Sequence, residues 1–148
     1  MLTEAIKTIF NRDLNALKKE IASYKNEAVI WHTERNISNS AGNLCLHLIG
    51  NVNHFFGATL GNTGYMRNRD AEFNDKNISA ADLISQIDAA IKMMDDVLSS
   101  IRPEQLQQEY PLMLMDKKHS MEFVLIFMAT HFSYHLGQIN YHRRLLDI

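Results

Sequence analysis

The chain has 148 residues, of which 46% are hydrophobic and 22% charged, and its formal net charge is −2 at pH 7. This composition excludes intrinsic disorder and indicates one globular domain over residues 1–148. There is no basic surface for nucleic acid and no apolar run long enough to cross a membrane, so we expect neither as a partner. A single cysteine excludes an internal disulfide, and the first ten residues do not resemble a signal peptide, so we expect a cytoplasmic protein.

Four segments carry apolar residues at the three- and four-residue spacing of an amphipathic helix. The first runs from about Leu2 to Tyr24. The second begins near Ser38 or Ser40, which are favourable N-cap residues, and reaches about Leu60. Within it, Gly50 and Gly57 lie on one stripe. Because glycine weakens a helix, this repeat predicts the close approach of another backbone.

The third predicted helix begins at Ser79–Asp82, which resembles a capping box, and it ends before Pro103. The fourth runs from about Ser120 to Leu146. The connections 61–78 and 102–119 are long for a compact domain, and their aromatic residues and methionines predict that they pack against it. The sequence therefore predicts an all-α fold, a four-helix bundle with long crossover loops.

Histidines occupy positions where apolar residues are expected. His131 and His135 lie four residues apart on one face of the fourth helix, and apolar residues lead into that face. His47 lies in the middle of the second helix. Buried imidazoles need partners for their ring nitrogens, and a divalent metal such as zinc, nickel, copper or iron is a partner that three of them can share. Three protein ligands leave a position open for water or substrate, as in catalytic zinc sites.

The alternative is that these histidines are hydrogen-bonded core residues, because spacing alone does not bring His47 to the other two. His54 and His142 each follow a candidate ligand by seven residues, about 10 Å along the helix, so we expect them to line the cavity or to pack at its edge. His32 and His119 fall in predicted loops and are expected to face solvent.

Other chemistries have little support in the sequence. It contains no Gly-rich phosphate loop, and no pair of Glu-x-x-His motifs of the kind that holds two iron ions. Cys45 stands between two leucines on a predicted helix, so we expect a buried structural cysteine.

Three blocks of the sequence resemble the DinB-like superfamily of damage-inducible and related bacterial proteins, and the first is similar to an uncharacterised branch of it. They are NSAGNLCLHLIGNVNHF at 39–55, RDAEF at 69–73 and HFSYHLGQINYHRRLL at 131–146. The resemblance implies a four-helix bundle that holds zinc or nickel through the histidines matching His47, His131 and His135. It also implies a homodimer formed by helix packing, and reactions such as S-transfer from low-molecular-weight thiols or a thiol-dependent isomerisation.

We therefore expect a metal-dependent enzyme of the thiol S-transferase or hydrolase type that acts on a small molecule. Asn51, on the same face as His47, is expected to hold a ligand histidine or the substrate, unless it only packs against a neighbouring helix. His54 is expected to line the pocket. Arg67 and Arg69 are expected to recognise a substrate carboxylate, unless they are solvated loop charges. The alternatives are a non-catalytic bundle whose ion serves stability or interaction, and a metal-free bundle dimer.

Overall fold

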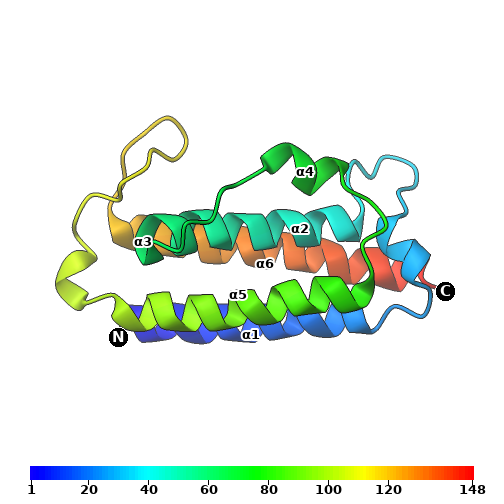
Figure 1. Cartoon of the computed structure of the whole chain (residues 1–148), viewed down its shortest axis with the longest axis horizontal. Helices are drawn as coiled ribbons and strands as arrows, with labels where there is room; N and C mark the ends of the chain where they lie inside the picture. Colours follow the sequence, from blue (N-terminus) through cyan, green and yellow to red (C-terminus); the bar gives the residue numbers. More distant parts are fainter.

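The computed structural model describes residues 1–148 and is an all-helical bundle, as the sequence predicted (Figure 1). Its long helices are α1 (Leu2–Ala22), α2 (Ala41–Val52), α5 (Ala80–Ser100) and α6 (Met121–Leu146). In Figure 1, α2 and α6 lie side by side above the pair formed by α1 and α5. None of the helices combines the length and the hydropathy that a membrane span requires.

Serine side chains fix the starts of three helices. The hydroxyl of Ser40 accepts a hydrogen bond from the Asn43 amide, and Ser79 and Ser120 cap α5 and α6 in the same way. Each bond satisfies an amide that the first turn of a helix leaves without a partner. The predicted starts of these helices are therefore confirmed.

The second predicted helix changes its geometry before it ends. A π-helical turn, η2 (Asn53–Ala58), follows α2, and the short α3 (Thr59–Gly61) completes the segment. The buried Tyr110 hydroxyl donates to the carbonyl of Phe55 in this turn at 2.7 Å, which anchors the connection 102–119 to the bundle. Asn62, with a φ of 49°, ends the segment in the left-handed conformation.

The connections contain short helices that the sequence pattern did not reveal. They are η1 (Glu27–Trp31), α4 (Arg69–Asn74) and η3 (Pro103–Gln105). Helix α4 packs on the outer side of α2 (Figure 1), where a Cβ atom on Gly50 would lie 1.9 Å from Oε2 of Glu72. Gly50 therefore makes room for a side chain. The predicted approach of another backbone is wrong, and Gly57 likewise faces side chains.

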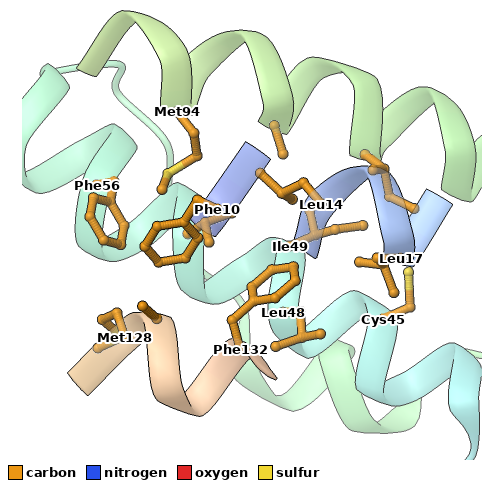
Figure 2. Packing of buried hydrophobic residues seen from close by; sticks show 14 of the residues in the cluster. Phe10, Leu14, Leu17, Cys45, Leu48, Ile49, Phe56, Met94, Met128 and Phe132 are labelled. Atoms are coloured by element: carbon orange, nitrogen blue, oxygen red, sulfur yellow. The ribbon is translucent and has the colours of Figure 1, made fainter. Parts of the chain in front are cut away.

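Aromatic rings at the centre of the bundle set the rotation of α6. Phe10 of α1 packs edge-to-face against Phe56 and Phe132, with ring centroids 5.2 and 5.9 Å apart (Figure 2). Because Phe132 points into this core, its neighbour His131 lies at the boundary between α6 and α2. Cys45 is fully buried, as predicted, and burial raises the pKa of its thiol to about 12.

Candidate metal centre

The three histidines singled out by their spacing meet between α2 and α6. His47, His131 and His135 each offer one ring nitrogen, and these atoms lie within 4.8 Å of one another. The ring centroids of His131 and His135 are 4.6 Å apart, and both lie just over 5 Å from the ring of His47. His47 is buried and the other two are half-buried. The fold therefore supplies the contact that the sequence pattern alone did not establish.

This donor set fits a divalent ion. Imidazole nitrogen is a common ligand for such ions, and a tetrahedral zinc ion holds nitrogens about 3.4 Å apart, given bond lengths of about 2.0–2.1 Å. The three ring nitrogens, all within 4.8 Å of one another, are close to that spacing. No aspartate, glutamate or cysteine belongs to the cluster, so the three histidines are its complete set of protein donors of these types.

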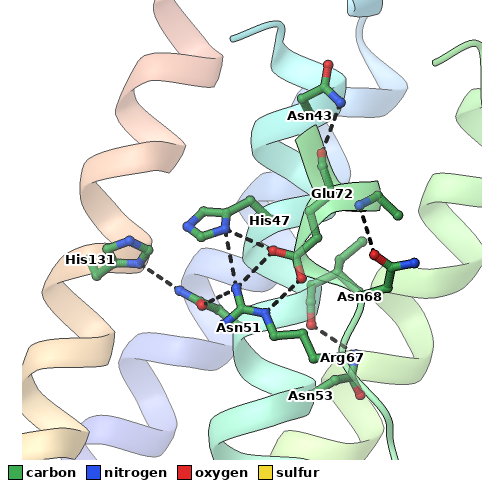
Figure 3. Close-up of polar contacts among 10 residues, drawn as sticks. Asn43, His47, Asn51, Asn53, Arg67, Asn68, Glu72 and His131 are labelled. Carbon is green, nitrogen blue, oxygen red and sulfur yellow. Dashed lines mark hydrogen bonds and ion pairs between the residues drawn. The ribbon is translucent and has the colours of Figure 1, made fainter. Parts of the chain in front are cut away.

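A carboxylate from a third element supports His47. Glu72 of α4 is buried, and its Oε1 lies 3.0 Å from Nδ1 of His47 (Figure 3). Arg67 donates to both carboxylate oxygens of Glu72, at 2.9 and 2.8 Å. Burial raises the pKa of Glu72, but the hydrogen bonds and charge interactions with His47 and Arg67 together lower it by more, so the net pKa is below its ordinary value. An ionised carboxylate accepts hydrogen bonds, so Nδ1 of His47 donates and Nε2 remains free to bind an ion.

His135 has a comparable partner on its own helix. Its Nδ1 lies 2.7 Å from Oε1 of Gln138, whose amide nitrogen in turn donates to the Tyr134 hydroxyl. This orientation of the amide makes Nδ1 of His135 the donor and leaves Nε2 free. Burial lowers the pKa of His135, and burial with the nearby positive groups lowers that of His131 to about 4. Both rings are therefore neutral at pH 7, which is the form that binds metal.

The residues predicted to line the pocket lie at different places around the cluster. Asn51 touches it directly, because its side-chain nitrogen lies 3.1 Å from Nδ1 of His131. His54 is half-buried on η2, outside the ligand cluster, and burial together with the nearby positive charge of Arg67 lowers its pKa. Arg69 is exposed and lies over the ring of Phe73, which in turn packs against His47.

The remaining histidines have structural partners. His142 is buried, accepts a hydrogen bond from Tyr24 at Nδ1 and donates from Nε2 to the backbone carbonyl of His32. The ring of His32 is exposed, as predicted. His119 is half-buried and stacks on Phe123 at 4.2 Å, so the expectation that it faces solvent is wrong. The reason is that its loop folds back on the start of α6.

Two residues of the centre, Glu72 and Gln138, were not found by sequence reasoning. Both lie in blocks that carry the resemblance to known proteins, RDAEF and HFSYHLGQ. Gly50 was a further signal, since a glycine in the middle of a helix marks a place where a neighbour comes close, and that neighbour is Glu72.

A cavity of about 450 Å³ opens beside His135. It lies between the segment 36–39 and the last turns of α6, and Tyr134 and Tyr141 form exposed aromatic walls. Gln138, which orients His135, is also part of its lining. No Asp, Glu, Lys or Arg side chain lines this cavity, and its volume suits a small molecule.

The chain was compared with known protein families and with curated proteins. No curated protein matches it. The family DUF1572, described as a protein of unknown function, matches residues 2–147. This match covers the bundle, the three histidines and Glu72 together. The chain therefore belongs to the DUF1572 family.

Proposed function

We propose that the chain is a divalent-metal-dependent enzyme of the DinB-like superfamily that transfers a small-molecule thiol to an electrophile. In this proposal His47, His131 and His135 hold one zinc or nickel ion. The observation that carries it is the cluster of three imidazoles without a fourth His, Cys, Asp or Glu donor. Structural zinc sites are usually closed by four protein ligands, whereas catalytic sites keep one position open.

The three proposed ligands are uncharged, and this affects the acidity of a thiol or water bound to the ion. Imidazoles do not reduce the charge of the ion, and a divalent ion lowers the pKa of a coordinated thiol or water toward neutrality. Glu72 and Gln138 bond Nδ1 of His47 and of His135, which leaves Nε2 of each ring free to bind an ion. The chain's own residues thus supply the binding and the orientation that such chemistry needs.

The surroundings of the cluster favour a thiol over water as the nucleophile. Metal-dependent hydrolases commonly pair the ion with a free carboxylate that acts as general base. Here the carboxylate nearest the cluster, Glu72, is already bonded to both His47 and Arg67. A thiol has a pKa of about 8.5 and water one of about 15.7, so the thiol loses its proton without such a base.

The cavity beside His135 is the proposed location of the electrophile. Its aromatic walls and amide groups suit an uncharged organic body of small size. In the reaction, the thiol sulfur attacks a carbon of the electrophile and forms a carbon–sulfur bond. The leaving group departs with the electron pair of the bond that breaks, and the thiol proton passes to the buffer.

The test uses protein purified without a histidine tag. After loading with zinc or nickel, it is mixed with cysteine and an alkyl halide that becomes fluorescent when a thioether forms. The loaded protein is expected to accelerate the reaction. Protein treated with a chelator and the His47→Ala variant are expected to show no acceleration. A parallel assay offers the loaded protein a chromogenic ester without thiol, and hydrolysis of the ester without thiol transfer would assign the hydrolase type instead. One bound ion with neither activity would support a non-catalytic metal-binding bundle.

A further inference from the structure

The orientation of the Asn51 amide is fixed by a neighbour that has no acceptor. Asn51 is buried, with 7% of its surface exposed, and it lies between Arg67 and His131 (Figure 3). Nη2 of Arg67 lies 2.8 Å from the side chain of Asn51, and a guanidinium only donates hydrogen bonds, so the facing atom is the amide oxygen. The amide nitrogen of Asn51 therefore faces Nδ1 of His131, at 3.1 Å.

This contact determines which ring nitrogen of His131 carries the proton. The Asn51 nitrogen donates, so Nδ1 of His131 accepts, and the proton of the neutral ring is on Nε2. His47 and His135 have the opposite arrangement, since each donates from Nδ1 to a carboxylate or amide oxygen. Two of the three rings thus have a free Nε2, and in the third that nitrogen carries the proton.

We propose that binding of a divalent ion is coupled to reversal of the Asn51 side-chain amide and to loss of the hydrogen bond from Arg67 to Asn51. This inference rests on the proposed metal centre. Ligation through Nε2 of His131 moves the ring proton to Nδ1, which then needs an acceptor. The Asn51 oxygen supplies one only after the amide turns over. Ligation through Nδ1 breaks the same hydrogen bond, because the ion and the amide compete for one lone pair.

Arg67 allows the Asn51 amide to turn over reversibly. Its guanidinium also bonds both oxygens of Glu72, so its charge remains paired when it leaves Asn51. Asn51 and Arg67 are therefore positioning residues that hold a metal-excluding arrangement and lower the apparent affinity for the ion. A carboxylate at position 51 removes this competition, because it accepts hydrogen bonds from Arg67 and from Nδ1 of His131 at the same time.

The first measurement is of metal affinity, by titration with zinc against a chromogenic chelator. Asn51→Asp is expected to bind zinc about tenfold more tightly than the unmodified protein, the scale on which residues that support a metal ligand act. The control is Asn53→Asp, which adds the same charge two residues along, on a side chain that bonds the Ile49 carbonyl. It is expected to stay within about threefold of the unmodified protein, because no hydrogen bond joins Asn53 to any of the three histidines. Equal or weaker binding by Asn51→Asp would overturn the inference.

The second measurement uses the unmodified protein, so it does not depend on any variant folding. Long-range proton–nitrogen NMR of the imidazoles reports which nitrogen carries the proton. Without metal, His131 is expected to carry it on Nε2, and His47 and His135 on Nδ1. One equivalent of zinc is expected to shift the side-chain amide signals of Asn51 and to move the His131 proton to Nδ1. His131 protonated on Nδ1 in the metal-free protein would overturn the inference while leaving the metal centre intact. If neither the unmodified protein nor the Asn51→Asp variant bound zinc, both this inference and the proposed metal centre would be overturned.

Discussion

Nδ1 of His47 lies 3.0 Å from Oε1 of Glu72, and the two residues come from different elements, α2 and α4. Helix α4 belongs to a connection that shows no periodic pattern in the sequence. Its carboxylate passes over Gly50 to reach the histidine. The candidate metal centre is therefore built from three elements, two of which supply the histidines and one of which orients a ligand.

Glu72→Gln is predicted to weaken zinc binding by about 10–100-fold, the range for residues that orient metal ligands. A glutamine has one acceptor atom, so it cannot serve His47 and both donors of Arg67 as the carboxylate does. Glu20→Gln is the control, because Glu20 also pairs with an arginine, Arg143, but lies on α1. Competition titration of both variants is the measurement. Equal zinc affinities would contradict the role assigned to Glu72.

Two glycines allow a matched comparison. Gly50→Ala is predicted to destabilise the protein and to weaken zinc binding, because its Cβ would lie 1.9 Å from Oε2 of Glu72. Gly137→Ala meets open space on α6 and is predicted to stabilise the protein by roughly 0.5–1 kcal/mol. Chemical denaturation and zinc titration of the two variants check this. Unchanged zinc affinity in a folded Gly50→Ala variant would show that Glu72 does not need its present position.

The cavity beside His135 gives a prediction that separates substrate binding from metal binding. Leu145→Trp adds bulk to the lining and is predicted to raise KM for the electrophile severalfold, while metal content stays the same. Ile148→Trp, fully exposed three residues further on, is the control and should leave KM unchanged. Steady-state kinetics with the loaded protein are the measurement. Equal KM values in the two variants would place the electrophile elsewhere.

His142 is predicted to make stability depend on pH without any role in metal binding. Burial lowers its pKa below the ordinary value near 6.5, so the unfolded chain binds more protons as the pH falls below that value. The stability it contributes is complete above about pH 6.5 and declines as the pH falls toward the folded-state pKa. A single group gives a slope of at most about 1.4 kcal/mol per pH unit.

Urea unfolding with a chelator present, at pH 7.5 and 5.5, tests this. His142→Gln should lose less stability between the two values than the unmodified protein does. The control is His32→Gln, which changes an exposed ring but keeps the backbone carbonyl that His142 uses. An unchanged pH dependence in His142→Gln would contradict the prediction.

The helices and their starts were predictable from the sequence because local chemistry determines them. Apolar spacing identified the four long helices, and serine caps marked three of their first turns. The π-helical turn at Asn53–Ala58 was not predictable, because an extra residue per turn leaves no distinct apolar pattern. Helix α4 was missed because six residues are too few to show a period.

The candidate site was predictable only in part. Histidines on apolar helix faces identified His47, His131 and His135, which the structure brings together. Glu72 was beyond the pattern, since a loop residue's place in space depends on tertiary packing. Arg67 was expected to recognise a substrate carboxylate, but the carboxylate that it binds is that of Glu72. The same holds for His119, which was expected to face solvent but stacks on Phe123 because its loop folds back.

The central claim is that these three histidines hold a divalent ion, and the thermal midpoint with and without metal tests it most directly. An ion that binds only the folded state stabilises it by about 4 kcal/mol at a thousandfold excess over Kd. Each kcal/mol moves the midpoint by roughly 2–4 °C for a chain of this size, so stripping the ion should lower it by on the order of 10 °C.

Zinc or nickel should restore the midpoint, and elemental analysis should find one ion per chain. His135→Ala should lose most of this response, since two imidazoles hold an ion less well than three. His119→Ala should keep it, because His119 lies outside the cluster. A midpoint that stays the same on chelation, with the ion confirmed absent, would contradict the account and leave the three histidines as core residues of the bundle.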